Sequence, residues 1–221
     1  DLHPAEPGIE TAVVHLLRHE QEQARSVLTR LLTESESDAE RGLASAWLAV
    51  LNGDWDEALL LLESMPREGP QSERLEAFMA ATAWAAGKHE LAIQGLTDYL
   101  AGHDGDIHAM SMLILAAAEA GDDQTLQHWS RRLLPHVEEN PLAGLALAQA
   151  ALRREDRDGA RRILERVVQA HPHQLAARTT LLMLLADARQ WDRCEEHVRA
   201  LLSLDPNHRL CNRGLSTLQM E

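Results

Sequence analysis

A short polar break between two apolar runs reads Gly53-Asp54-Trp55-Asp56-Glu57-Ala58. Similar breaks begin at residues 87, 121, 155 and 189, and a sixth, His19-Glu20-Gln21-Glu22-Gln23-Ala24, fits the same frame. The six starting positions are spaced by 34 residues, with no insertion or deletion. A constant spacing of this size indicates a chain built from repeated supersecondary units.

The apolar residues around the Gly53 break recur with helical spacing. Before it come Leu43, Ala46, Trp47, Val50 and Leu51, and after it come Ala58, Leu59, Leu61, Leu62 and Met65. A glycine after the last periodic residue ends a helix, and an aspartate such as Asp54 or Asp122 is suited to cap the next one. Pro70, Pro172 and Pro206 end the second helix of their units. Each unit is therefore predicted to be a helix, a tight turn, a second helix and a loop, which makes the fold all-α.

With these features the chain resembles the tetratricopeptide repeat (TPR) family. The resemblance covers six units, at 5–38, 39–72, 73–106, 107–140, 141–174 and 175–208. The small residue that the family has in its first helix matches Ala12, Ala46, Ala80 and Ala148. The family's alanine in the second helix, with a bulky apolar residue four positions later, matches Ala24/Leu28, Ala58/Leu62, Ala92/Leu96 and Ala160/Leu164. Leu126/Ser130 is a poor match, and Cys194/Val198 a near one.

The resemblance implies a right-handed superhelical solenoid of antiparallel helix pairs, forming a single domain over 1–221. Pro4 and Pro7 predict that the first helix begins near Ile9, and an apolar stripe predicts a capping helix at 209–221. The large aromatic residue that the family carries early in each first helix is absent. Its six positions hold Gly8, Gly42, Glu76, Met110, Gly144 and Arg178.

The resemblance also implies a binding groove, because ligands of this family usually lie against the first helices. The partner-binding positions predicted from it are Leu43, Trp47, Val50, Trp84, Leu115, Leu145, Gln149, Leu152, Arg153 and Met183. This lining is mostly apolar. It lacks the Lys, Asn and Arg set with which some family members clamp a chaperone's terminal carboxylate, so that role is not expected.

Three interpretations of this apolar groove stay open. It binds an amphipathic helix or apolar peptide of a partner protein, it is buried by self-association in a homodimer, or its side chains belong to the core between repeats. An alternative role is architectural, in which the chain is a region of a larger bacterial secretion, envelope or polysaccharide-export component. Twenty of the 21 basic residues are Arg, which favours a GC-rich bacterial gene.

The net charge of −14 is placed unevenly. Residues 1–106 hold 20 acidic and 7 basic residues, whereas residues 107–221 hold 15 and 14. This charge argues against a nucleic-acid partner, and no apolar run is long enough to span a membrane. Six arginines cluster between Arg153 and Arg166. They form either a solvated helix face with local pairs such as Arg161–Glu165, or a basic docking surface for an acidic partner.

Neither catalysis nor a cofactor is predicted. The chain has no glycine-rich phosphate loop, nucleophile elbow or paired-carboxylate signature. His15/His19 and His171/His173 lack a third ligand nearby, so no metal site is expected. Cys194 is expected to be a small buried hydrophobic residue, with Cys211 as a less favoured disulfide partner. Free cysteines slightly favour the cytoplasm over the periplasm. Trp55, Trp129 and Trp191 are expected in the core.

Overall fold

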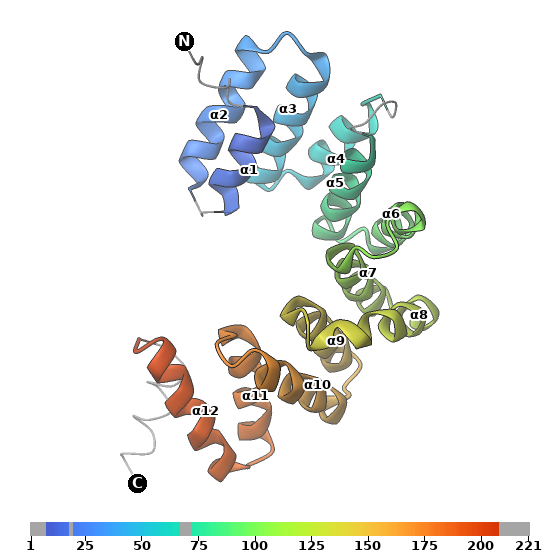
Figure 1. Cartoon of the computed structure of the whole chain (residues 1–221). Coiled ribbons are helices and arrows are strands. Elements are labelled where there is room, and N and C mark those ends of the chain that lie inside the picture. Colours follow the sequence, from blue (N-terminus) through green and yellow to red (C-terminus); the bar gives the residue numbers. More distant parts are fainter. Residues whose placement is uncertain (1–7, 18–19, 67–71, 208–221) are drawn as a thin grey trace. The chain divides into compact units, whose positions relative to one another are not determined.

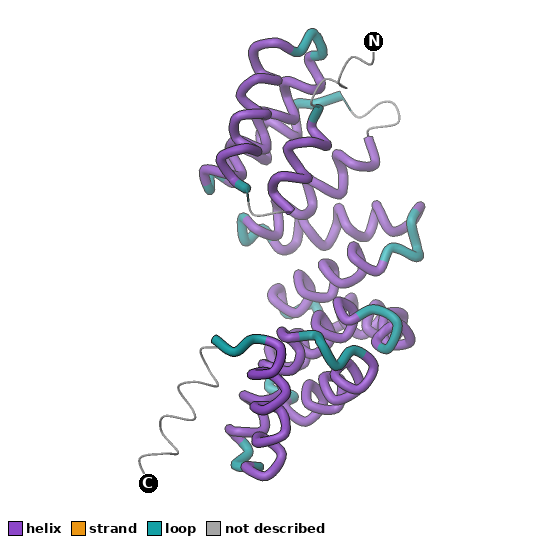
Figure 2. The backbone as a smooth tube through the Cα atoms, turned by 60° about the vertical axis from the view of Figure 1, so that its left-hand side comes forward, coloured by secondary structure: helices purple, strands orange, loops and turns teal. Residues whose placement is uncertain are grey.

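The computed structural model describes residues 8–17, 20–66 and 72–207 (Figure 1). Within these residues the regular elements are helices and no strand occurs, as Figure 2 shows by colour. The chain falls into two compact units, Asp1–Asp104 and Gly105–Glu221. The all-α fold of helix pairs predicted from the repeat is confirmed.

The first unit contains three helix pairs. They are α1 (Ile9–Leu17) with α2 (Gln21–Glu34), α3 (Asp38–Asn52) with α4 (Trp55–Glu63), and α5 (Ser72–Ala85) with α6 (His89–Gly102). Besides the partners in each pair, α2 packs on α3 and α4 packs on α5. The first helix begins at Ile9, as the prolines before it predicted.

The second unit contains three further pairs. They are α7 (Ile107–Ala120) with α8 (Asp123–Leu133), α9 (Pro141–Arg153) with α10 (Arg157–Ala170), and α11 (Leu175–Asp187) with α12 (Trp191–Leu204). A short 3₁₀ helix, η1 (Leu134–Val137), follows α8 directly. Pro135 lies inside it, which explains why the α-helix ends early at Leu133. The predicted capping helix at 209–221 lies outside the described residues.

The 34-residue register is visible in the structure itself. The second helices begin at residues 21, 55, 89, 123, 157 and 191, each 34 after the last. The turns before five of them contain a left-handed residue at the same repeat position: Gly53, Gly87, Gly121, Glu155 and Arg189. Glycine adopts this conformation without strain, whereas Glu155 and Arg189 adopt it at a cost.

One backbone hydrogen bond closes each of these turns. The amide of Asp54 donates to the carbonyl of Ala49 over 2.9 Å. The same bond recurs from Glu20 to His15, Lys88 to Ala83, Asp122 to Ala117, Asp156 to Ala151 and Gln190 to Leu185. It ends the first helix in the way typical of a left-handed C-terminal turn. The bond from Glu20 to His15 shows that the first repeat shares this hydrogen bond with the other five.

The capping predictions were half correct. The carboxylate of Asp122 accepts a hydrogen bond from the amide of Thr125 over 3.1 Å, so it caps α8. Asp54 stands at the same position before α4, yet its side chain makes no capping bond. The prediction for Asp54 is wrong: its backbone is close to that of Asp156, which does cap its helix, so the side chain of Asp54 points away from the amides of α4 without a backbone cause.

Alanine and leucine fill the core where the repeat pattern predicted them. The small residues of the first helices and the alanine–leucine pairs of the second helices are at most 2% exposed: Ala12, Ala46, Ala80, Ala148, Ala24, Leu28, Ala58, Leu62, Ala92, Leu96, Ala160 and Leu164. Trp129 is also buried, as expected. Trp191 is not, because 60% of it is exposed, and this prediction is wrong. Trp191 is the first residue of α12, where one side of the helix end is open to solvent.

Neighbouring side chains occupy the positions of the missing aromatic residues. The side chain of Met65 packs beside Gly42. A methyl group added at Gly144 would lie 2.1 Å from Cγ2 of Val167, so this valine already fills that space. At the sixth position Arg178 is buried, and its Nη2 donates to the carbonyl of Pro172 over 2.9 Å. At these three positions the space or the side chain is thus met by a group of the second helix or of the loop that follows it.

Candidate functional site

A hollow of about 440 Å³ lies on the first helices of the first unit. It is lined by residues of α1, α3 and α5: Ile9, Glu10, Val13, Val14, Glu40, Leu43, Trp47, Leu75 and Phe78. Seven of these nine side chains are apolar, and the other two are acidic. Since the amphipathic stripes of three first helices meet here, the hollow follows from the repeat register.

Trp47 and Phe78 form the centre of this lining. Their rings stack with centroids 4.3 Å apart and planes 20° from parallel, which joins α3 to α5. Trp47 is half-buried and packs against the core of the first two helix pairs, around Leu28 and Ala44. One part of the indole therefore supports the fold while another part borders the hollow. Val14 is 44% exposed at its edge.

Two carboxylates, Glu10 and Glu40, stand among the apolar side chains of the hollow. Oε2 of Glu40 accepts a hydrogen bond from the hydroxyl of Ser35 over 2.6 Å, which holds this carboxylate in place. The first 106 residues carry a net charge of −13 in total. A ligand in the hollow therefore contacts an apolar surface in a region of negative charge.

The structure brings together only some of the predicted groove residues of the first unit. Leu43 and Trp47 both line the hollow. Val50 and Trp84 are half-buried on α3 and α5 but are not part of that lining. The prediction missed Ile9, Val13 and Val14, although their helical spacing in α1 was readable from the sequence. It also missed Phe78, whose stacking on Trp47 depends on how α3 and α5 pack.

The remaining predicted residues lie on the first helices of the second unit. Leu115, Leu145 and Leu152 are half-buried on α7 and α9. Gln149 and Arg153 are exposed, and Met183 on α11 is 45% exposed. The guanidinium of Arg153 forms an ion pair with Glu119 on α7. Their role in binding stays a prediction.

The cluster from Arg153 to Arg166 is mostly paired with carboxylates. Arg154 reaches Asp123 over 3.1 Å, Arg157 reaches Asp187 over 2.8 Å and Arg166 reaches Glu138 over 3.0 Å. Arg161 contacts Asp158 and Glu165 on its own helix. These contacts favour the interpretation that the arginines form a solvated helix face with local ion pairs. Several of the pairs, however, join neighbouring repeats and do not lie within one helix.

Several ionisable side chains outside the hollow are buried or paired with a neighbouring side chain. Cys194 is buried, as expected, and burial raises the pKa of its thiol. Cys211 and His19 lie outside the described residues. Nδ1 of His15 lies 2.6 Å from Oε2 of Glu20. Burial, together with the adjacent Arg178, lowers the pKa of His197. Across the described ranges no three His, Cys, Asp or Glu side chains are grouped so that they could hold a metal ion.

None of the helices in the described residues is long and apolar enough to cross a membrane.

A model of the tetratricopeptide repeat matches residues 18–82 and 151–214, more than half of the chain. The chain belongs to the tetratricopeptide repeat family. The TPR fold is commonly a protein-interaction scaffold, and proteins of this kind are generally non-catalytic. A search of the curated proteins found no significant match.

Solved structures share this TPR fold at low sequence identity. The chain superimposes on the crystal structure of the APC/C hetero-tetramer Cut9-Hcn1 with a TM-score of 0.63 and 16% identity, over 95% of this chain and 41% of that one. A TPR protein from Parabacteroides merdae gives a TM-score of 0.60 and 15% identity, over 88% and 77%. PilF of Pseudomonas aeruginosa gives a TM-score of 0.57 and 16% sequence identity, and the match covers 95% of both chains. The chain thus spans less than half of the Cut9-Hcn1 chain that it matches. At these identities the likeness shows the fold alone.

Proposed function

We propose that this TPR protein is a non-catalytic scaffold that binds a segment of a partner protein in the hollow formed by α1, α3 and α5. The observation that carries the proposal is the apolar lining around the half-buried Trp47 and Phe78. Aromatic side chains in such positions contribute much of the binding energy in protein interfaces. Leu43 and Val14 add aliphatic surface to the same lining.

The charge around the hollow specifies the kind of segment. Glu10 and Glu40 belong to the lining, and the surrounding first unit is strongly acidic. An acidic partner would be repelled, whereas a segment with basic residues beside an apolar stripe complements both features. The occupant that we infer is therefore an amphipathic helix with leucine-like anchors and a basic flank.

Direct binding of a defined peptide tests this proposal. The probe is a fluorescein-labelled, 14-residue amphipathic helix of leucine and lysine, and its binding is followed by fluorescence anisotropy. We expect Trp47→Gln to weaken binding by about tenfold or more, because it removes a central aromatic contact. Trp191→Gln is the matched control, since it changes the same residue type at an exposed position on α12.

Two results would count against the proposal. Equal binding to the parent chain and to Trp47→Gln would show that the peptide does not use the hollow. If light scattering instead shows a dimer that Trp47→Gln converts to a monomer, while the peptide does not bind, the hollow is a self-association surface. Circular dichroism of both variants checks that helicity is retained.

A further inference from the structure

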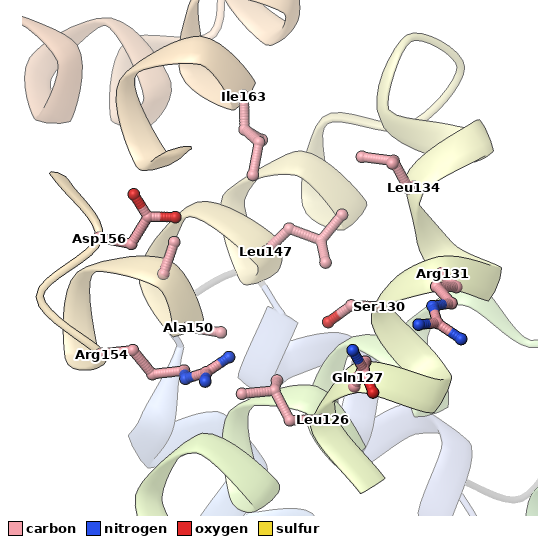
Figure 3. Close-up of a pocket in the computed structure, with 11 residues that line it drawn as sticks. Leu126, Gln127, Ser130, Arg131, Leu134, Leu147, Ala150, Arg154, Asp156 and Ile163 are labelled. Carbon is pink, nitrogen blue, oxygen red and sulfur yellow. The ribbon is translucent and has the colours of Figure 1, made fainter. Parts of the chain in front are cut away.

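A second hollow, also of about 440 Å³, lies in the second unit among α8, η1, α9 and α10 (Figure 3). Five of its eleven lining residues lie on the second helices α8 and α10 and three on the first helix α9, whereas the first hollow is formed by first helices alone. It shares no residue with the positions predicted for the groove. Its function is therefore a separate question from that of Trp47.

A local departure from the repeat explains why this space is open. Ser130 stands where four of the other five repeats have a buried leucine, Leu28, Leu62, Leu96 and Leu164, and the last has Val198. A serine leaves unfilled much of the volume that a leucine would occupy. In addition, α8 ends at Leu133, and Pro135 continues the chain as the 3₁₀ helix η1. The shortened side chain and the early helix end together produce the hollow.

One wall of this hollow carries unused hydrogen-bonding groups. Gln127, Ser130 and Arg131 lie on one face of α8, because they are three and four residues apart. Their side chains make no hydrogen bond or ion pair with any other described residue. Figure 3 shows Gln127 and Ser130 close together on this helix. This wall can therefore donate several hydrogen bonds to a ligand.

The other charged groups of the lining are already engaged. Nη2 of Arg154 lies 3.1 Å from Oδ1 of Asp123. Oδ1 of Asp156 accepts a hydrogen bond from the amide of Gly159 over 2.8 Å, which caps α10. Among the charged side chains of this lining, the guanidinium of Arg131 is therefore the one that makes no ion pair or hydrogen bond with another described residue. Its positive charge favours an anionic ligand.

The opposite wall is apolar. Leu147 of α9 and Ile163 of α10 reach into the hollow across from Gln127 and Ser130, and Leu134 of η1 adds apolar surface beside Arg131 (Figure 3). The space is within the range of pockets that hold small ligands or a few residues of a peptide. A suitable ligand therefore has an apolar group on one side and an anionic group on the other.

We propose that this hollow binds a short segment of a partner protein in which a carboxylate lies next to a branched apolar side chain. The carboxylate accepts hydrogen bonds from Arg131, Ser130 and Gln127. The apolar side chain packs against Leu147 and Ile163. The basic segment inferred for the first hollow would be repelled here, so the two hollows select segments of opposite charge.

The probe for this proposal is a fluorescein-labelled heptapeptide of alternating leucine and glutamate, titrated with the whole chain. A second peptide with glutamine in place of glutamate keeps the apolar residues and removes the charge. We expect the glutamate peptide to bind about fivefold to tenfold more tightly, since charge-assisted hydrogen bonds are stronger than neutral ones. Arg131→Gln should reduce binding of the glutamate peptide by a similar factor.

Two variants make this test specific. Ser130→Leu restores the residue that the repeat pattern expects, so the variant should fold, and it should abolish binding by filling the hollow. Arg162→Gln removes the same charge from an exposed position of α10 and should leave the affinity unchanged. Trp47→Gln should also bind the glutamate peptide normally, which keeps this test independent of the first hollow.

Three outcomes would overturn the proposal. They are no binding of the glutamate peptide, undiminished binding to Ser130→Leu, and an equal loss of affinity in Arg162→Gln and Arg131→Gln. The last would show that only the general positive charge of the region attracts the peptide.

Discussion

At the scale of single residues, the turn inside each repeat shows how the sequence tolerates strain. Five turns place a residue in the left-handed region, with φ between 55° and 81°. Three of the five have glycine, but Glu155 and Arg189 have side chains that this conformation disfavours. Glu155 is exposed, and its side chain forms no contact that would offset the cost. The repeat register imposes the turn even where the residue does not favour it.

Glu155→Gly should therefore stabilise the protein by roughly 0.5–1 kcal/mol, because glycine adopts the left-handed turn without a steric penalty. A glycine introduced into the middle of a helix would instead lower the free energy of unfolding. Gly121→Ala is the matched opposite change, and it should destabilise the same kind of turn by a similar amount. Thermal unfolding followed by circular dichroism measures both effects. A lower melting temperature for Glu155→Gly would show that the strain is absent.

At the scale of helices, two aspartates at the same repeat position behave differently. The side chain of Asp122 accepts a hydrogen bond from the amide of Thr125, whereas that of Asp54 makes no capping bond. The hydrogen bonds with Thr125 also lower the pKa of Asp122 from its usual 3.8. An aspartate at this repeat position is thus not sufficient to cap the helix that follows it.

Asp122→Ala should destabilise the protein by about 1 kcal/mol, the usual cost of losing an N-terminal cap, while Asp54→Ala should cost much less. The difference has a defined pH dependence. Because the pKa of Asp122 is lowered in the folded state, its contribution is present above pH 3.8 and is lost as the pH falls through the folded-state value. Urea unfolding of both variants at pH 7 and at acidic pH measures this. Equal losses at pH 7 would contradict the assignment of the cap.

At the scale of the whole molecule, the period of 34 residues was enough to predict the helix pairs. It placed the second helices and their turns because one register applies to all six repeats. It could not predict that Trp191 is exposed while Trp55 is half-buried, since exposure at this position depends on what packs against the helix end. That the repeats form one uninterrupted solenoid over 1–221 stays a prediction of this register.

The candidate site was less predictable from the sequence. Leu43 and Trp47 were found because they occupy known positions of the first helix. The stacking of Phe78 on Trp47 and the place of Val14 in the lining depend on how three helices pack, which a repeat frame does not specify. The hollow beside Ser130 was visible only as a poor match to the family pattern. A residue that departs from the repeat pattern, such as Ser130, thus indicated where a hollow could lie but did not show its shape or its lining.

The most direct test of the central claim is to locate the bound segment by hydrogen–deuterium exchange. The leucine–lysine peptide is added to the whole chain, and amide protection is compared with that of the free protein. We predict added protection in α1, α3 and α5, around the hollow that Trp47 and Phe78 form, and its loss in Trp47→Gln. Protection confined to α7, α9 and α11, or unchanged exchange under saturating peptide, would contradict the account.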